Sequence, residues 1–317
     1  MSPLPTDEPV PSAPAATADA AAATGLAPDT AAAKRTDALR AGRVALCRWR
    51  CRVRAYVGTH HVSVELRTVG RSLRLQTVRS VRRPVAAAAP QLEAALQTLG
   101  DALEELRRTS QADVGRNFGG VACEVILADA WLVYDVVPVD LARLSPALAH
   151  QAIAAALADI VGAPASTLWV RWQRQRDGRA AFGMALNRND LDALRSVVTA
   201  HRLRLAAVTG EFIAVLNAQR AVLPSDRTVV AIVREAGTQI ATLAGGDVAL
   251  AQFELGLADA AALPAVAQRA LSARGLESAA TINFCVDMAG RSAADSGAPE
   301  GAAAWRWLPA PAWTHST

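Results

Sequence analysis

Apolar and polar residues alternate along three neighbouring segments between residues 44 and 83: RVALCRWRCRVRAY, THHVSVELRTV and RSLRLQTVRSV. A period of two is typical of β-strands, whose successive side chains point to opposite faces of a sheet. The segments therefore predict a three-stranded meander, with turns at Gly58-Thr59 and Gly70-Arg71. In the first segment, arginines at every second position give the strand one basic and one apolar face: Arg48, Arg50, Arg52 and Arg54.

A helical pattern follows the meander. Leucines recur at spacings of four and three residues and form one stripe on a helix: Leu92, Leu96, Leu99, Leu103 and Leu106. Because the stripe spans only about two heptads, we expect it to pack on the sheet rather than in a coiled coil. Residues 120–138 predict two strands around Ala128-Asp129, and Ser145-Pro146 predicts the start of a helix that ends near Ile160.

Similar elements recur in the second half of the sequence. Residues 167–186 predict a hairpin with Asp177-Gly178 at its turn, and NDLDALRSVVTAH predicts a helix capped by Asn189. A short strand, RLRLAAVTG, and a helix, EFIAVLNAQRAVL, follow. Residues 228–255 predict a second meander, which is followed by a helix that ends near Leu271 and by a last strand, TINFCV. The repeated order predicts an α/β protein of two halves with mixed sheets.

The composition changes at both ends of the chain. Residues 1–40 consist mostly of Ala, Pro, Thr and Asp, which predicts a disordered tail, and residues 291–317 predict a flexible C-terminal tail. Between the tails, we expect a first half with an inserted subdomain over residues 41–161 and a second half over residues 162–290. Three tryptophans of the C-terminal tail could dock on the folded part or on a partner, or could lie in solvent: Trp305, Trp307 and Trp313.

The basic residues are almost all arginine. Of 33 Lys and Arg residues, only Lys34 is a lysine, which excludes the lysine of a P-loop and a Schiff-base lysine in a folded pocket. Residues 43–83 contain eleven arginines and a single acid, Glu65. The basic strand could bind anionic lipid headgroups or nucleic acid, or could simply be solvated. The scarcity of aromatic residues and the lack of a nucleic-acid-binding motif argue against nucleic acid.

Few residues suggest metal or acid–base chemistry. His150 and His201 lie in predicted helices and are interpreted as structural residues. The sequence has no hydrolase, metalloprotease or dinucleotide-binding motif. It also has no apolar run long enough to span a membrane and no signal-peptide pattern, so we expect a cytoplasmic location. Four residues could in principle ligate zinc, although their spacing favours buried thiols instead: Cys47, Cys51, His60 and His61.

Two meanders that each open an α/β half resemble the actin-like, ribonuclease-H-type ATPase fold. Residues 56–66, YVGTHHVSVEL, are similar to the first phosphate loop of the PilM family of pilus-assembly proteins, Asp-Ile-Gly-Ser/Thr followed by a strand. WLVYDVVP, which ends in Pro138, and residues 228–255, with a turn at Gly245-Gly246-Asp247, resemble further segments of that family. The resemblance covers residues 44–287 and extends to the cytoplasmic domain of GspL-type secretion proteins. It implies two ribonuclease-H-like halves with mixed sheets, the second truncated before the Gly-rich segment that cradles adenosine in the family.

The positions that should bind magnesium depart from the family pattern. Where the family has an Asp before each Gly, this chain has Tyr56 at the first turn and Ile232, Val233 or Arg234 at the second. Without those carboxylates, nothing would place a metal opposite the γ-phosphate, and we expect Tyr56 to fill part of the phosphate space. We therefore expect no catalytic residue, metal or cofactor, and only vestigial phosphate turns kept for backbone geometry: Gly58, Thr59, Gly237 and Thr238.

The resemblance implies a catalytically silent cytoplasmic scaffold, a pseudo-ATPase, in a type IV pilus or type II secretion-like assembly platform at the inner membrane. It implies two partners, the cytoplasmic tail of a PilN-like single-pass membrane protein and the assembly ATPase. The membrane surface is a further candidate partner for the basic strand. Two other classes stay open: an active nucleotide-binding enzyme of the actin and sugar-kinase superfamily, and a nucleic-acid-binding protein that uses the arginine-rich meander.

Overall fold

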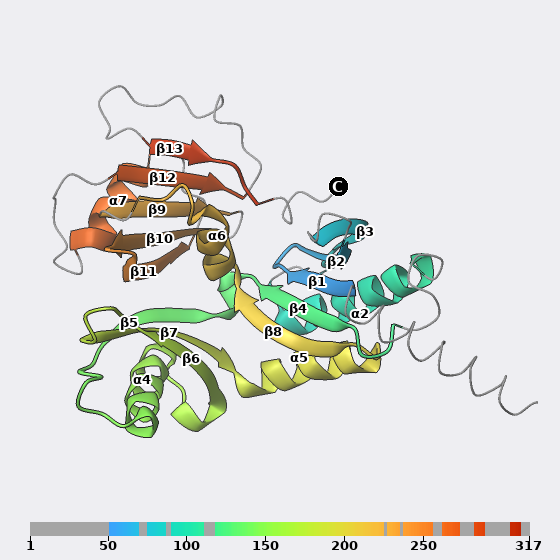
Figure 1. Ribbon diagram of the computed structural model, residues 1–317, viewed down its shortest axis with the longest axis horizontal. Helices are drawn as coiled ribbons and strands as arrows, with labels where there is room; N and C mark the ends of the chain where they lie inside the picture. Colours follow the sequence, from blue (N-terminus) through green and yellow to red (C-terminus); the bar gives the residue numbers. More distant parts are fainter. Residues whose placement is uncertain are drawn as a thin grey trace, which may run out of the picture. The chain divides into compact units, whose positions relative to one another are not determined.

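The computed structural model describes residues 51–69, 75–86, 90–110, 118–224, 227–234, 237–255, 262–272, 282–288 and 305–311 (Figure 1). These residues form three β-sheets with helices packed against them. The predicted N-terminal tail lies outside the described residues, as do the Gly70-Arg71 turn, Cys47, Arg48, Arg50 and Trp313.

The first sheet has five strands in the order β3-β2-β1-β4-β8. β1 pairs antiparallel with β2, and β2 pairs antiparallel with β3, which confirms the predicted meander. β1 also pairs parallel with β4, which in turn pairs parallel with β8. The strands are β1 (Cys51–Val57), β2 (His61–Val69), β3 (Leu75–Pro84), β4 (Ala122–Leu127) and β8 (Arg204–Gly210).

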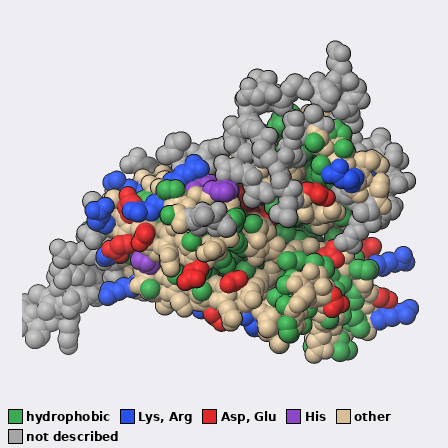
Figure 2. Space-filling model, turned by 180° about the vertical axis from the view of Figure 1, so that it is seen from behind, with side chains coloured by type: hydrophobic (Ala, Val, Ile, Leu, Met, Phe, Trp, Pro, Cys, Tyr) green, Lys and Arg blue, Asp and Glu red, His purple; other side chains and the backbone are tan. Residues whose placement is uncertain are grey.

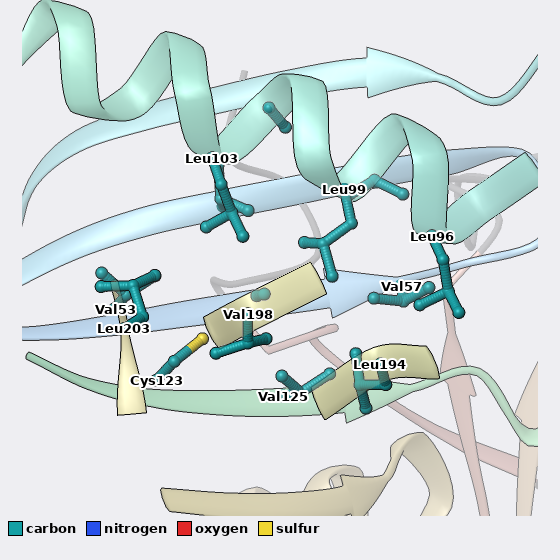
Figure 3. Packing of buried hydrophobic residues seen from close by; sticks show 14 of the residues in the cluster. Val53, Val57, Leu96, Leu99, Leu103, Cys123, Val125, Leu194, Val198 and Leu203 are labelled. Carbon is teal, nitrogen blue, oxygen red and sulfur yellow. The ribbon is translucent and has the colours of Figure 1, made fainter. Parts of the chain in front are cut away.

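Helix α2 (Leu92–Thr109) packs on this sheet, as its leucine stripe predicts. The stripe is buried except at Leu92, which is half-buried. Each such side chain that leaves water contributes about 1.5–3 kcal/mol, so this core is sufficient to hold α2 on the sheet. Figure 3 shows the leucines of α2 facing apolar side chains of β1 and β4, with helix α5 (Arg188–Ala200) in the same cluster: Leu96, Leu99, Leu103, Val53, Val57, Cys123, Val125, Leu194 and Val198.

A second, three-stranded sheet is inserted between β4 and β8, in the antiparallel order β5-β7-β6. β4 and β5 are the two strands predicted over residues 120–138, but they belong to different sheets. The inserted elements are β5 (Val133–Pro138), helix α4 (Pro146–Val161), β6 (Leu168–Arg174) and β7 (Ala180–Asn187), with short 3-10 helices at Asp129–Trp131 and Ala165–Thr167.

Local signals set the ends of the inserted elements. Ser145 Oγ accepts a hydrogen bond from the Leu148 N–H at 3.3 Å, which confirms the predicted cap of α4. The turn between β6 and β7 contains Asp177-Gly178, as predicted. The predicted cap of α5 is wrong by two residues, because the Asn187 side chain accepts a hydrogen bond from the Asn189 N–H at 2.9 Å. β7 runs up to Asn187, so the helix starts directly at the strand end.

The third sheet repeats the strand order of the first. Its order is β11-β10-β9-β12-β13, with β9, β10 and β11 antiparallel and β12 and β13 added in parallel. The meander predicted over residues 228–255 is therefore confirmed. The elements are β9 (Thr228–Val233), β10 (Gly237–Ala244), β11 (Asp247–Leu255), helix α7 (Leu263–Ser272), β12 (Ile282–Asp287) and β13 (Trp305–Leu308).

Strand β13 corrects the prediction of a flexible C-terminal tail. Trp305 pairs with Asn283 and Trp307 with Cys285, so the segment is the fifth strand of the sheet and β12 is not the last. Both tryptophans pack against the core on the α7 side, so they dock on the folded part of the chain rather than lie in solvent. The third sheet is thus as wide as the first. In the first half, helix α6 (Glu211–Gln219) follows β8.

The predicted boundary between the halves after residue 161 is also wrong. β8 pairs with β4, so β8 completes the first sheet although it lies far beyond residue 161. The repeat begins at β9, and residues 133–187 form the insertion. Within the part of the chain that the structure describes, no helix is long and apolar enough to cross a membrane.

Candidate functional site

The two meanders place equivalent turns at the ends of β1 and β9. The Gly58 N–H donates to the His61 carbonyl at 3.0 Å, and the Arg234 N–H donates to the Gly237 carbonyl at 2.9 Å. In each hairpin, the residue pair directly before this hydrogen-bonded turn is the last pair of the two strands. It is Val57 with Val62 in the first hairpin and Val233 with Thr238 in the second. Arg234 is therefore the structural counterpart of Gly58, and Ile232 is the counterpart of Tyr56.

This register changes the sequence-based assignment of the second turn. Gly237 and Thr238 were predicted as the vestigial counterparts of Gly58 and Thr59, but the hairpin aligns Gly237 with His61. The position of the family glycine is held by Arg234, and the position of the family Asp is held by Ile232. At these two positions the second hairpin thus has neither the carboxylate nor the glycine of the pattern.

The first turn is filled by Tyr56. Its side chain is buried, and a Cβ added to Gly58 would lie 2.7 Å from the Tyr56 Cε1 and 2.7 Å from the His61 carbonyl oxygen. Glycine is required here because the position has no room for a side chain. The Tyr56 hydroxyl is hydrogen-bonded to the carboxylate of Glu211, and burial raises its pKa well above the usual value, with the charge on Glu211 adding to the effect.

Arg234 makes a buried double ion pair. Its Nε donates to Glu211 Oε2 at 2.5 Å, and its Nη2 donates to Asp129 Oδ2. Its Nη1 donates to the Ile232 carbonyl at 3.3 Å. All three charged residues are almost fully enclosed, at 7% exposed for Arg234, 3% for Asp129 and 1% for Glu211. We call Tyr56, Asp129, Glu211 and Arg234 the buried charge cluster.

Strand ends bring these residues together. Tyr56 lies near the end of β1, Asp129 follows β4, Glu211 follows β8 and Arg234 follows β9. Since β1, β4 and β8 are parallel, their carboxyl ends meet at one edge of the sheet, where ligands bind in open α/β sheets. The buried charge cluster occupies that position.

Asp129 also orders its neighbours. Its Oδ1 accepts hydrogen bonds from the Tyr134 hydroxyl at 2.7 Å and from the Phe212 N–H at 3.0 Å. The latter satisfies an N–H group in the first turn of α6, whose N-cap residue Gly210 has no side chain to do so. A Cβ on Gly210 would lie 1.6 Å from the Tyr134 hydroxyl, so the space beside Gly210 is filled, like the space beside Gly58.

Burial and ion pairing act in opposite directions on the pKa values of the cluster. Burial raises the pKa of Glu211, although the Arg234 guanidinium opposes this shift. For Arg234, burial alone would lower the pKa, but Asp129 and Glu211 outweigh it and raise the pKa above the usual value. The guanidinium therefore stays positive. Tyr134, which bonds Asp129, packs with two phenylalanines in stacked and edge-on arrangements, and the Tyr134, Phe182 and Phe212 centroids lie 5.5 to 6.0 Å apart.

The residues present do not fit a magnesium-bound nucleotide at this place. Magnesium prefers oxygen ligands in octahedral geometry, with carboxylates among them. The two positions that should supply those carboxylates hold Tyr56 and Ile232, and both side chains belong to one buried apolar cluster. Asp129 and Glu211 are already paired with Arg234, whose positive charge would repel a dication.

The predicted basic surface is partly neutralised by acids from outside the meander. Arg52 and Arg54 lie on the more exposed face of β1, as expected, but both approach Glu124 of β4, with N···O distances of 2.5 Å and 4.0 Å. Arg83 pairs with Glu105 of α2 at 2.7 Å. On the face shown in Figure 2, positive and negative side chains are interspersed rather than gathered by sign.

The other candidate residues do not come together. His61 packs beside Tyr56 with ring centroids 5.2 Å apart, whereas His201 faces Glu104 of α2 at 3.8 Å and His150 is exposed on α4. Cys51 is buried. Among the described residues, no group of three or more His, Cys, Asp or Glu side chains could hold a metal ion.

Sequence reasoning missed Asp129, Glu211 and Tyr134. For the two carboxylates, the sequence position was an available signal, because Asp129 follows a buried strand and Glu211 directly follows the strand RLAAVTG. Had β8 been assigned to the first sheet, the two carboxylates would have been expected at the same edge.

The fold is similar to those of solved structures. A Bacteroides thetaiotaomicron protein with an actin-like ATPase fold and unknown function matches with a TM-score of 0.54 at 8% sequence identity, over 82% of this chain and 91% of that chain. A PilM–PilN type IV pilus biogenesis complex matches with a TM-score of 0.54 at 11% identity, over 74% of this chain and 81% of that chain. The cytoplasmic domain of EpsL, an inner-membrane component of the Vibrio cholerae type II secretion system, gives 0.49 at 11% identity, over 83% and 91%.

No protein-family model matches the chain, and no curated protein matches it in sequence. The structural similarities establish the class: the chain has the actin-like ATPase fold, as predicted. The resemblance to PilM-like proteins that the sequence indicated is confirmed at the level of the fold.

Proposed function

We propose that this chain is a catalytically silent scaffold of a type IV pilus or type II secretion-like assembly platform, and that it acts on the cytoplasmic face of the inner membrane. The observation that carries the proposal is the buried charge cluster. Arg234 supplies the positive charge at the point where a nucleotide-binding relative would need a metal, and it is fixed there by Asp129 and Glu211.

The alternative of an active nucleotide-binding enzyme requires a free carboxylate and an open turn. Tyr56 and Tyr134 occupy the space beside Gly58 and Gly210, and neither family Asp position is acidic. Phosphoryl transfer depends on metal positioning and charge stabilisation, so these substitutions remove its central requirement. The buried aromatic rings support a permanently filled site rather than one that exchanges ligands.

The assembly role is supported by resemblance and by fold. The phosphate-loop segment resembles that of PilM, and one solved structure of the same fold is a PilM–PilN complex. We infer as partner the cytoplasmic tail of a PilN-like inner-membrane protein, with the assembly ATPase as a second partner. Nucleic acid is disfavoured, because Glu124 and Glu105 offset the arginines that would contact phosphates.

A pull-down tests the assembly role. The tagged full chain is incubated with detergent-solubilised inner membranes of its own host, and bound proteins are identified by mass spectrometry. We expect a single-pass membrane protein with a short cytoplasmic tail to be enriched. Recovery of nucleic acid or of metabolic enzymes, without such a protein, would contradict the proposal.

A matched pair of charge reversals tests whether β1 is the recruiting surface. Arg52 and Arg195 are similarly exposed, at 51% and 58% of their side chains, and each pairs with one carboxylate, Glu124 or Asp192. We expect Arg52→Glu to reduce binding to anionic vesicles or to the membrane partner and Arg195→Glu to leave it unchanged. Equal effects of both variants would show that only net charge matters.

A further inference from the structure

A cavity of about 330 Å³ lies between β5 of the inserted sheet and the β10–β11 hairpin of the third sheet. Its volume is at the lower end of the range of ligand sites in proteins, about 300–1,000 Å³. Among the described residues, the lining is mostly apolar, with the Gln239 amide and one carboxylate, Asp135. The described residues that line it include Val133, Asp135, Gln239, Ala251, Gln252 and Phe253.

Gln239 is the unusual member of this lining. It is 1% exposed, and neither its Nε2 nor its Oε1 has a hydrogen-bond partner among the described residues. Its neighbour Ile240 packs in the core on the α7 side, so Gln239 points to the opposite face of β10. Burying an amide without partners costs about 1–3 kcal/mol, and such groups in native proteins call for an occupant.

Gln252 of β11 provides a comparison on the other face of the sheet, because it pairs with Ile240, whose side chain packs on the α7 side. Its Nε2 donates to Glu254 Oε1 at 2.8 Å, so this amide already has a partner. The two glutamines of this hairpin thus differ: Gln252 has a partner on the α7 side, whereas the Gln239 amide has none among the described residues. Gln239 offers one donor and one acceptor side by side, which matches the N–H and C=O of a peptide group.

The two strands beside the cavity could also pair with a peptide backbone. β11 is the outer strand of the third sheet, and β5 is the outer strand of the inserted sheet. The two strands lie against each other, but they do not pair with one another (Figure 1). Outer strands present backbone N–H and C=O groups that an added extended segment can pair with.

We propose that the cavity is a docking site for an extended, uncharged segment of a partner polypeptide, whose backbone pairs with the Gln239 amide and with an adjoining strand edge. The lining explains the choice of an uncharged segment, because its described residues include no Lys or Arg to attract an acid, and Asp135 is their one carboxylate. The inference holds whichever protein supplies the segment, so it does not depend on the assembly role proposed above.

Selection from a phage-displayed library of linear twelve-residue peptides tests the inference on the full chain. Enriched peptides are titrated calorimetrically into the wild-type protein, Gln239→Met and the matched control Gln252→Met. We expect at least a tenfold loss of affinity for Gln239→Met and less than a twofold loss for the control. Hydrogen exchange should show that a bound peptide protects residues 133–135 and 251–253.

Three outcomes would overturn the inference: no peptide is enriched on the wild type, the enriched peptides bind Gln239→Met equally well, or protection maps away from both strands. In each of these cases the cavity holds water, which would satisfy the amide without a ligand. If Gln239→Met melts well below the wild type, Ala251→Val replaces it, since this change narrows the cavity from β11. Peptide binding should then be lost while the melting temperature stays near that of the wild type, and retained binding would contradict the inference.

Discussion

The first and third sheets have the same strand order and the same hairpin geometry, yet different residues stand at the equivalent position of their turns. The turn after β1 has a glycine, packed under a tyrosine ring. The equivalent turn after β9 has an arginine, which reaches across to two carboxylates that follow strands of the first sheet. In both hairpins, strand pairing fixes the geometry of the turn, whichever residue stands at its first position. Between the two halves, the Arg234 guanidinium pairs with Asp129 and Glu211.

The largest expected effect comes from removing that internal cation. Arg234→Met leaves Asp129 and Glu211 buried without a counter-charge, which costs about 3–5 kcal/mol when one partner of a buried pair is lost. Urea unfolding measures the loss. Arg176→Met, which removes an exposed arginine that pairs with Asp247, is the matched control and should cost less than about 1 kcal/mol.

A companion variant sharpens this prediction. In Arg234→Met with Glu211→Gln, one of the two stranded charges is gone, so part of the lost stability should return. If the single variant costs no more than the surface control, Arg234 does not hold the two halves together.

The first turn should be sensitive to shape rather than charge. In Gly58→Ala the added methyl group would meet the Tyr56 ring and the His61 carbonyl, both at 2.7 Å, and we expect a loss of about 1–3 kcal/mol. Gly100→Ala in α2 is the control, because its Cβ would have only ordinary contacts, the nearest at 3.6 Å. That variant should be neutral or slightly more stable, since alanine is the better helix former. A Gly58→Ala protein as stable as the control would show that the turn is open.

His61, beside Tyr56, should make the first turn acid-sensitive. Burial lowers its pKa from about 6.5 to about 4, and Arg82 and His60 add to the shift. Above pH 6.5 His61 is neutral in the folded and unfolded states, so it does not reduce the free energy of unfolding there. As the pH falls from 6.5 towards 4, only the unfolded state gains the proton, and stability is lost.

Melting curves between pH 7.5 and 4.5 measure this effect. His61 is partly exposed, so solvent screening limits the loss to about 1–2 kcal/mol. We expect His61→Gln to lose less stability in acid than the wild type, and His150→Gln, a change on the exposed face of α4, to behave like the wild type. Identical acid sensitivity of the wild type and His61→Gln would place the sensitive group elsewhere.

The smallest effect is expected at the exposed pair of Arg52 and Glu124. It has the same chemistry as the Arg234 pair, with an N···O distance of 2.5 Å, but 51% of the arginine side chain is exposed. Exposed pairs contribute about 0–1 kcal/mol, so Arg52→Ala should change the free energy of unfolding by no more than that. A loss as large as that of Arg234→Met would mean that burial does not explain the difference between the two pairs.

Local patterns predicted the elements better than their assembly. Alternation and the leucine stripe predicted both meanders and α2, because each depends on residues close in sequence. β13 was missed because its four residues, WRWL, lie in an Ala- and Pro-rich segment that dilutes the pattern. The boundary between halves was wrong because the pairing of β4 with β8 spans a whole inserted sheet, and no local signal encodes it.

The site was predictable only in part. The replacement of the family Asp by Tyr56 was visible in the sequence, and the structure places that ring in the turn. The ion pairs of Arg234 join residues 105 and 23 positions apart, so charge patterning along the chain could not reveal them. The counterpart of Gly58 in the second turn was assigned wrongly because Gly237 looked like the turn residue, whereas the pairing aligns Gly237 with His61 and Arg234 with Gly58.

The central claim is that Tyr56 and Arg234 fill the nucleotide site. Isothermal titration of the full wild-type chain with Mg-ATP tests it most directly, with a thermal-shift series beside it. The filled site predicts no binding tighter than about millimolar, which corresponds to roughly 4 kcal/mol, and no rise in melting temperature at millimolar Mg-ATP. Micromolar binding, or a rise of several degrees, would contradict this claim and favour an active nucleotide-binding enzyme.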